Sequence, residues 1–542
     1  MHWAEFFASK FADKGTQRIA AGITPSGEFH IGHLREILTC DILFRAVRNT
    51  EGQTFEELKQ RDREEEQKSI QRQSDEWQRR INRDTGKLFQ SKQEFDDYVL
   101  RGGGKSLIED EPGFLDTLDS HVKELTEWRE NNEDFTEFIF IIDDADPLRK
   151  VYPFLDAEYE KFVGHQLGNI PPPDLEGKPD YARYSDGMGD SYADHYVGPF
   201  IEALKKIGVR PIIIRNLELY QSGDYSEYID QAFEKSDEIR EIITNVSGRE
   251  LPEDWYPFNP VGSDGSLDEV KVTGYDASSG LVSWTDRHGI NGTSDIRKGQ
   301  GKLPWRIEWA AKWALLKVSC EPFGKDHAAS GGSYDTGKEI VKLFSDPEGN
   351  PCQAPLPLPY EWISIKGGGA MSSSTGNAIG PLDVLEIVSP EIIRFLIAKN
   401  QPKRHINFDT GSSLIELSDE YHKSLEDLDK YNQKDSDELD EMSTRQKKAI
   451  KVLVSTIAYS QIEDITQLAY ADDAHVHEVL DLSGGGVASF RHLSLLAQMY
   501  PDNRDVWQSL FESNKIGSHT HNFLMEIGDQ NIGSPYIIKA GV

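Results

Sequence analysis

Two histidines, His30 and His33, lie in a short segment whose pattern suits phosphate chemistry. The apolar run at residues 19–23 predicts a buried strand, and the small residues after it predict a turn. Apolar positions then recur at helical spacing over residues 32–49. A helix N-terminus binds phosphate through its unpaired N–H groups, and histidines donate hydrogen bonds to phosphate oxygens. Two histidines alone would more often mark an ordinary surface corner, but the whole segment favours a nucleotide site.

The same segment carries a family resemblance. Its string Thr24-Pro-Ser-Gly-Glu-Phe-His-Ile-Gly-His33 resembles the HIGH signature of class I aminoacyl-tRNA synthetases. With Leu34-Arg-Glu-Ile-Leu-Thr39 after it, the segment is similar to the class I lysyl-tRNA synthetases of archaeal type. The resemblance covers most of residues 18–47 and 137–410. It implies an α/β fold with a Rossmann-like parallel sheet, activation of L-lysine with ATP and Mg²⁺, and transfer of the lysyl group to the 3′-terminal ribose of tRNA-Lys.

A block of acids follows the next predicted strand. The apolar run at residues 138–142 ends in Asp143-Asp-Ala-Asp-Pro-Leu-Arg-Lys150, which resembles a block of the same family. A run without polar positions predicts a central parallel strand, and open α/β sheets bind ligands at the carboxyl ends of such strands. These acids suit the ammonium groups of an amino acid or a magnesium ion. For any single acid, capping the loop is an equal alternative.

A second group of candidate residues lies in the other half of the chain. The turn Gly324-Lys-Asp-His327, with small residues after it, suits adenine and ribose against the backbone, with Asp326 on the ribose hydroxyls. The resemblance implies an ATP site that includes Thr24, Pro25, Gly32, Gly324 and Asp326. It implies a lysine pocket lined by Gly22, Thr24, Trp305, His327 and Tyr360.

Residues 360–366 predict a further strand, and the segment after residue 366 resembles the second class I signature, KMSKS. Its residues Met371, Ser372, Ser373 and Ser374 would then contact ATP, with hydroxyls for the pyrophosphate oxygens. Both signature lysines are missing, because Ala370 and Ser373 stand in their places. A loop without lysine neutralises a triphosphate poorly. We therefore hypothesise that Lys366, the nearest cation, replaces them and acts in catalysis with His30 and His33.

Two departures from the family argue against zinc. In relatives a zinc ion lies near the block Ser191-Tyr-Ala-Asp-His195, but here only His195 is retained, with Met188 and Gly189 where ligands would fall. Relatives also carry paired Cys-x-x-Cys knuckles in the region of residues 252–299, where this chain has no cysteine. We expect a knuckle-shaped loop held by packing, with His195 as a weak metal candidate.

Composition limits the class of protein. With 93 acidic and 59 basic residues, the formal net charge is −34, which by itself argues against a polyanionic partner. The favoured interpretation is a protein of a high-salt cytoplasm, where carboxylates keep the surface hydrated and salt screens their repulsion. The three cysteines cannot build a disulfide framework. We expect no targeting or membrane-spanning segment and a cytoplasmic protein.

The chain is long enough for several domains. We predict a catalytic domain from residues 1–50 and 134–245, continued by residues 301–410. Two insertions interrupt it: a charged helical module at residues 51–133, of unknown role, and a knuckle-like segment without cysteines at residues 246–300. Residues 411–542 are helical in pattern and predict an α-helical anticodon-binding domain. The sequence does not give the oligomeric state, although a monomer is favoured.

We therefore predict a class I lysyl-tRNA synthetase. The nearest alternative is a glutamyl-type class I enzyme, because Trp305-Arg-Ile-Glu-Trp309 is compatible with both. The second alternative is a catalytically inactive, synthetase-like RNA-binding protein, motivated by the loop without lysine.

Overall fold

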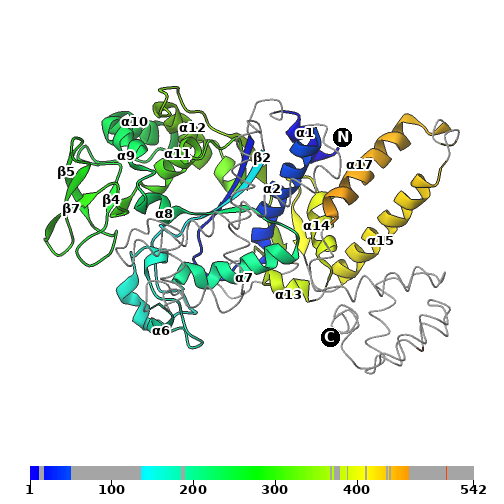
Figure 1. Ribbon diagram of the computed structural model, residues 1–542, viewed down its shortest axis with the longest axis horizontal. Coiled ribbons are helices and arrows are strands. Elements are labelled where there is room, and N and C mark those ends of the chain that lie inside the picture. The colour runs from blue at the N-terminus through cyan, green and yellow to red at the C-terminus, as the bar shows by residue number, and fades with distance from the viewer. Residues whose placement is uncertain are drawn as a thin grey trace, which may run out of the picture.

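A five-stranded parallel sheet forms the centre of the computed structural model, which describes residues 1–10, 17–50, 136–184, 190–365, 369–370, 379–386, 388–408, 412–434, 438, 441–462 and 508. The strand order is β10-β9-β1-β2-β3. Figure 1 shows β2 near the middle of the molecule, with helices on both sides of it. The bounds of these strands are β1 Gln17–Ile23, β2 Thr136–Ile142, β3 Ile212–Arg215, β9 Cys320–Gly324 and β10 Leu356–Tyr360.

Both faces of this sheet are covered. All seven residues of β2 are buried, which explains why its sequence has no polar alternation. Phe138 and Phe140 pack into one hydrophobic core, whereas Ile139 and Ile141 pack into a second core on the opposite face. The first core is shared with α1 Trp3–Ala8, α2 Ile31–Thr50, α7 Tyr192–Lys206 and α14 Pro390–Ala398. The second core is shared with α8 Asn216–Gln221, α9 Ser226–Glu234, α10 Ser236–Ser247, α11 Trp305–Leu315 and α12 Ser333–Ile340.

The strand order creates a switch point beside β1. Strands β2 and β3 follow on one side of β1, and the chain later returns to place β9 and β10 on its other side. Loops that leave β1 and β9 therefore diverge to opposite faces. This separation opens a crevice at the carboxyl ends of the strands.

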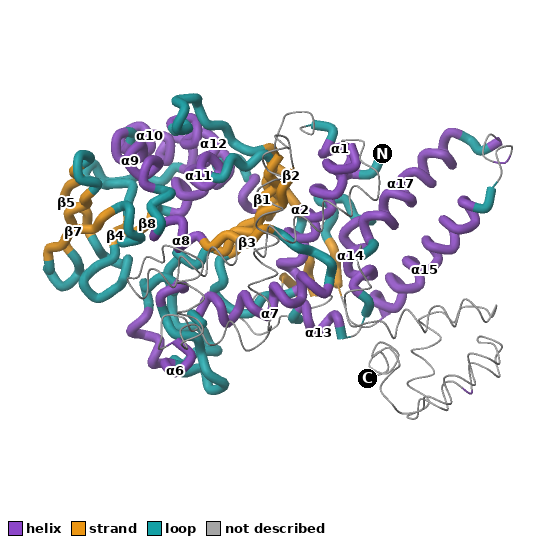
Figure 2. Tube along the Cα trace, viewed as in Figure 1, coloured by secondary structure: helices purple, strands orange, loops and turns teal. Residues whose placement is uncertain are grey.

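Two peripheral regions flank the sheet at opposite ends of the molecule (Figure 2). At one end lies an antiparallel ribbon of β5 Lys271–Asp276, β6 Leu281–Thr285 and β7 Asn291–Asp295, beside the short pair β4 Asn259–Pro260 and β8 Gly301–Lys302. At the other end lie α15 Ser412–Asn432 and α17 Thr444–Ser460. Smaller elements are α6 Tyr181–Tyr184, α13 Pro381–Leu385, β11 Ile363–Ile365, β12 Gly369–Ala370, β13 Ile406–Phe408 and the 3₁₀ turns Ala157–Phe162, Leu167–Asn169, Lys325–Ala328 and Val341–Leu343.

Arg394, on α14, joins four helices. Its side chain is fully buried, and its guanidinium pairs with Asp41 on α2 at 2.5 Å. It also donates hydrogen bonds to the carbonyl oxygens of Tyr459, on α17, and of Ile207, at the end of α7. One side chain thus connects the sheet-covering helices to the terminal helix pair.

The predicted α/β fold is confirmed, with one correction in detail. We predicted one strand over residues 360–366, but the structure divides this region between β10, which ends at Tyr360, and β11, which belongs to a separate three-stranded sheet. Strand β10 contains Pro357 and Pro359, which lack an N–H to donate, and it lies at the sheet edge where none is needed. The charged module at residues 51–133 and most of residues 463–542 lie outside the described residues, so the domain boundaries stay predictions.

No helix in the described ranges is both long and apolar enough to cross a membrane.

Replacing Arg394 with Met should destabilise the protein by about 3 kcal/mol, because it leaves a buried carboxylate and two buried carbonyl groups with fewer partners. Denaturant unfolding of the full chain measures this loss. Lys399→Met is the control, since Lys399 follows the last residue of the same helix and forms an ion pair with the exposed Glu420. This substitution should change the free energy of unfolding by less than about 1 kcal/mol. Equal effects of the two substitutions would contradict the joining role of Arg394.

Candidate active site

A cavity of about 510 Å³ lies at the carboxyl ends of the parallel strands, at the switch point. Gly22 and Thr24 enter it from the end of β1, and Tyr360 enters it from the end of β10. Its walls include every residue expected for the lysine pocket: Gly22, Thr24, Trp305, His327 and Tyr360. They also include Gly324 and Asp326, which were expected to bind ATP. The sheet therefore brings together residues that are more than 300 positions apart in the sequence.

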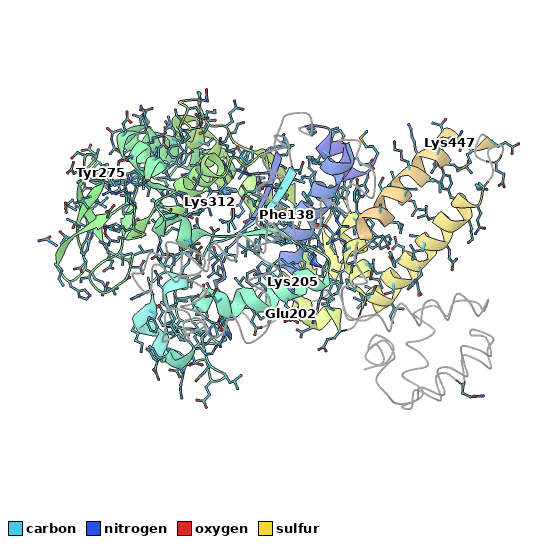
Figure 3. All side chains as sticks on the ribbon, viewed as in Figure 1. Phe138, Glu202, Lys205, Tyr275, Lys312 and Lys447 are labelled. Carbon is cyan, nitrogen blue, oxygen red and sulfur yellow. The ribbon has the colours of Figure 1, made fainter. Side chains whose placement is uncertain are left out.

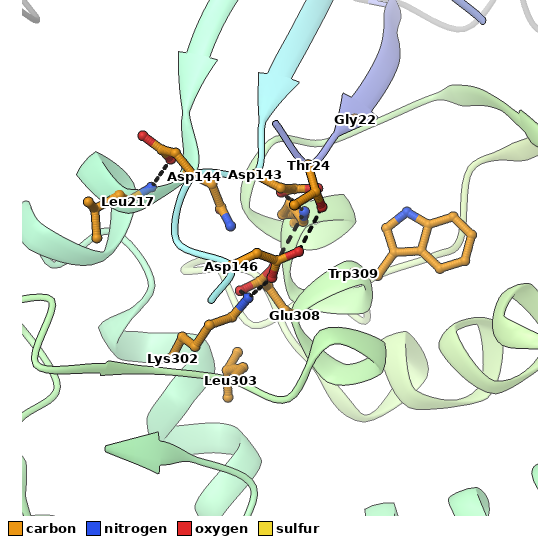
Figure 4. Close-up of polar contacts among 12 residues, drawn as sticks. Gly22, Thr24, Asp143, Asp144, Asp146, Leu217, Lys302, Leu303, Glu308 and Trp309 are labelled. Atoms are coloured by element: carbon orange, nitrogen blue, oxygen red, sulfur yellow. Dashed lines mark hydrogen bonds and ion pairs between the residues drawn. The ribbon is translucent and has the colours of Figure 1, made fainter. Parts of the chain in front are cut away.

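A cluster of buried ion pairs forms part of the cavity wall (Figure 4). The ammonium of Lys302 contacts Asp146 and lies 3.0 Å from Glu308, while that of Lys312 contacts Asp143 and lies 3.5 Å from Glu308. Thr24 donates a hydrogen bond of 2.7 Å to Asp146. Lys312, labelled in Figure 3, belongs to α11, and its ammonium reaches Asp143 at the end of β2. The cluster ties α11 and β8 to the ends of β1 and β2.

These contacts change the expected role of the acidic block. Burial would raise the pKa of Asp146, but the ammonium of Lys302 and the hydrogen bonds from Lys302 and Thr24 outweigh it and hold the pKa at about 2. Asp144 accepts hydrogen bonds from Arg215 and from the backbone N–H of Leu217. Asp143, Asp144 and Asp146 therefore already have cationic partners within the chain. A magnesium ion does not fit directly on them, and Asp144 is the loop cap that the sequence allowed as an alternative.

Two carboxyl groups of the cavity were missed by sequence reasoning. Glu36, on α2, accepts hydrogen bonds from the backbone N–H of Gly22 at 3.1 Å and from the hydroxyl of Tyr360 at 2.5 Å. Burial raises its pKa to about 8. Glu321, in β9, accepts hydrogen bonds from the indoles of Trp309 and Trp313, and burial raises its pKa to about 7. Glu36 belongs to the segment Leu34–Thr39 that carries the family resemblance, but no role was assigned to it, and no signal in the sequence marked Glu321.

His30 and His33 lie at the start of α2 with their rings stacked, 3.9 Å between centroids. Nδ1 of His30 accepts a hydrogen bond from the backbone N–H of Gly32, and Nδ1 of His33 accepts one from the backbone N–H of His30. Because Nδ1 is the acceptor in both rings, the proton of each neutral imidazole is on Nε2. Burial lowers the pKa of His30 to about 4, and burial together with His30 lowers that of His33 to about 3. Both side chains are therefore neutral hydrogen-bond donors at physiological pH.

Gly32 owes its identity to the histidine ring beside it. A Cβ at this position would lie 2.7 Å from ring atoms of His30, closer than real contacts allow. Glycine at this position thus makes room for the ring of His30, whereas the resemblance implied that it belongs to the ATP site. His30, His33, Pro25 and Gly32 lie outside the set of residues that line the 510 Å³ cavity.

The second signature-like loop begins and ends near the first. Strand β12 pairs with β11 before the loop. After the loop, the carbonyl oxygen of Ile379 accepts a hydrogen bond of 3.0 Å from the backbone N–H of Ile31, at the start of α2. Lys366 and the predicted ATP contacts Met371, Ser372, Ser373 and Ser374 lie outside the described residues. The end of their loop nevertheless adjoins the two histidines.

The expected zinc positions have side chains that do not fit the metal. His195 accepts a hydrogen bond on Nδ1 from the guanidinium of Arg183, at 3.2 Å, so this nitrogen already contacts a cation and does not suit a metal ion. At the knuckle-like tips, Ser263 donates to Asp286, and Asp264 pairs with Arg287 at 2.6 Å. Described side chains offer no cluster of three or more metal-binding groups. Hydrogen bonds and an ion pair, and not packing alone as we expected, join the two tips.

Comparisons with known proteins agree on one family. The family model described as "tRNA synthetases class I (K)" matches residues 1–79 and 121–449. A protein of Thermoplasma volcanium named lysine–tRNA ligase is 36% identical over 517 residues, which are 95% of this chain and 75% of that protein. A lysine–tRNA ligase of Picrophilus torridus is 34% identical over 97% of this chain and 78% of its own, and lysine–tRNA ligase 1 of Methanosarcina acetivorans is 33% identical over 94% and 76%. A glutamate–tRNA synthetase of Elizabethkingia anophelis aligns with a TM-score of 0.31 at 12% identity over 97% of both chains, too low to carry an argument.

Chelation should leave the fold unchanged, because the knuckle-like tips are joined by hydrogen bonds and an ion pair. We expect the purified protein to contain less than one equivalent of zinc by mass spectrometry, and its thermal midpoint to be the same with and without EDTA. Arg287→Met, by contrast, should lower the midpoint. One equivalent of zinc, or a lower midpoint in EDTA, would contradict this account.

Proposed function

Because this chain belongs to the class I (K) family of tRNA synthetases, we propose that it is a lysine–tRNA ligase whose 510 Å³ cavity binds L-lysine. The enzyme joins lysine to AMP with release of pyrophosphate and then transfers the lysyl group to the terminal ribose of tRNA-Lys. The observation that carries the choice of lysine is the carboxyl group of Glu36, held by Tyr360 and Gly22 at the cavity wall.

The charges of the site favour a cationic substrate. In the buried cluster, the carboxyl groups of Asp143, Asp146 and Glu308 share only two ammonium groups, those of Lys302 and Lys312. Glu36 and Glu321 add two further carboxyl groups at the cavity. An ammonium group that enters such a site finds an acceptor, whereas a carboxylate finds repulsion. This argument separates lysine from the glutamate of the nearest alternative.

The first step requires positioning of ATP and neutralisation of its phosphates more than a covalent nucleophile. Substrate carboxylate attacks the α-phosphorus, and the bond to the leaving pyrophosphate breaks. His30 and His33 have their Nε2–H groups free of the backbone contacts that occupy Nδ1, so they can donate to phosphate oxygens as charge develops. Asp326 and Gly324 are assigned to the ribose and adenine. Mg²⁺ would come with ATP and neutralise phosphate charge, because the buried acids already face lysines.

The charge missing from the second loop has two candidate sources. Lys366 remains the replacement that the sequence suggests. Arg149 is the second, since it lines the cavity, is exposed, and has no carboxylate partner among the described residues. A guanidinium binds phosphate oxygens bidentately, so either residue, or both together, could stabilise pyrophosphate.

The alternatives predict different assay results. We expect ATP–pyrophosphate exchange with L-lysine and none with L-glutamate, measured in molar KCl because of the net charge of −34. Glu36→Gln should raise the KM for lysine about ten- to a hundredfold, because it removes a charged acceptor from a buried site.

Glu361→Gln is the matched control, since Glu361 pairs with Lys325 outside the cavity lining and should leave the KM for lysine unchanged. Exchange with glutamate would favour the glutamyl-type enzyme. Binding of tRNA without exchange or charging would favour the inactive RNA-binding protein.

The activity should depend on pH through Glu36. With a pKa of about 8 in the free site, its carboxyl group is protonated at pH 6 and has to lose this proton before it can pair with an ammonium. The KM for lysine should therefore fall as pH rises from 6 to 8, by at most about tenfold per pH unit, and then level off. Glu36→Gln should flatten the profile. A KM that rises over this interval would contradict the assignment.

A further inference from the structure

A second cavity lies behind the wall of the first. It has about 240 Å³ and is formed by the end of α10, the segment after it, β4 and the start of α11. Its lining includes two tryptophans, Trp255 and Trp305, and two arginines, Arg249 and Arg306. Trp305 also lines the larger cavity, so one indole borders both spaces.

The two arginines lack acidic partners. Neither Arg249 nor Arg306 forms an ion pair with any described carboxylate, in a chain whose acids exceed its basic residues by 93 to 59. The guanidinium of Arg306 lies over the ring of Trp305, 4.8 Å from its centroid, and its buried Nε has no hydrogen-bond partner among the described atoms. Burial, and then the charge of Arg249, lower the pKa of Arg306. The positive charges of Arg249 and Arg306, together with the buried Nε–H of Arg306, favour the binding of an anion in this cavity.

The aromatic part of the cavity narrows the choice of anion. Indole faces stack on nucleobases, and paired guanidinium groups bind a phosphate bidentately. The volume is below the roughly 300–1,000 Å³ of pockets that hold whole drug-sized ligands, so it suits one base and its phosphate. Stacking also tolerates salt better than isolated phosphate contacts do, which matters for a protein with this excess of acids. An acidic peptide would pair with the arginines but would have no base to stack on the indoles.

We propose that this second cavity binds one nucleotide of the single-stranded 3′ end of the tRNA, with the base on the indole of Trp255 and the phosphate held by Arg249 and Arg306. This inference rests on the proposed function, because the 3′ end has to reach the lysine cavity that shares Trp305. Because Trp305 lines both cavities, the ribose next to the bound nucleotide can lie near the activated lysine.

The test compares two forms of the tRNA transcript, full-length and lacking its last four nucleotides, in binding to the full-length protein. Wild-type protein should bind the shortened transcript about tenfold more weakly. Arg249→Gln and Trp255→Leu should weaken binding of the full transcript by a similar factor and leave binding of the shortened one unchanged. Arg240→Gln is the control, since Arg240 pairs with Asp237 on α10 and does not line the cavity.

Lysine-dependent exchange with saturating full-length tRNA transcript separates this inference from the proposed function. Arg249→Gln should exchange at the wild-type rate and show a raised KM for tRNA in charging. If both variants weaken the two transcripts equally, or neither transcript, the 3′-end site is wrong. Should Trp255→Leu fail to fold, Arg249→Gln alone decides. If the wild-type protein shows no exchange while Arg249→Gln still abolishes the difference between transcripts, the proposed function fails and the RNA site stands.

Discussion

The arrangement of the site depends on a cluster of buried charges at the carboxyl ends of the central strands β1 and β2. Lys302 and Lys312 lie between the acids that follow β2 and Glu308 on α11. Charges removed from water are costly unless their partners are held in place. This cost constrains the fold: β8 and α11, which follow an excursion of the chain through the antiparallel ribbon, have to return to the ends of β1 and β2. The walls of the 510 Å³ cavity are therefore fixed by electrostatics as well as by packing.

Burial also sets the protonation states of the groups that would meet substrates. It keeps His30 and His33 neutral, and it raises the pKa of Glu36 and Glu321. The same desolvation thus gives neutral donors near the start of α2 and carboxyl groups that release a proton when a cation arrives. A site with these properties can bind an anionic nucleotide and a cationic amino acid within one crevice, because the two kinds of group come from different strand ends.

The excess of acidic residues limits which side chains can contact RNA. Many basic side chains of the described ranges form ion pairs with carboxylates, as Arg215 does with Asp144 and Arg394 does with Asp41. Contact with a polyanion then has to use the few basic groups without acidic partners and the faces of aromatic rings. A strongly negative net charge and an RNA substrate are compatible when recognition depends on local chemistry and not on the overall field.

The sequence by itself determined the main strands and helices around the site and their order along the chain. The apolar run that became β2 could only be a strand buried on both faces, and the string from Thr24 to His33 indicated the strand, turn and helix that the structure contains. The resemblance to the family also named part of the cavity lining, such as Gly22, Trp305 and Tyr360.

Only the tertiary structure decided which charges meet. Lys302 and Asp146 are 156 positions apart, and nothing local in either segment indicates that they pair. The same holds for Glu36, whose distinctive environment comes from Tyr360 on a distant strand, and for the knuckle-like tips, where Arg287 pairs with Asp264. Local patterns follow from backbone geometry, whereas pairing and desolvation depend on neighbours that only the folded chain supplies.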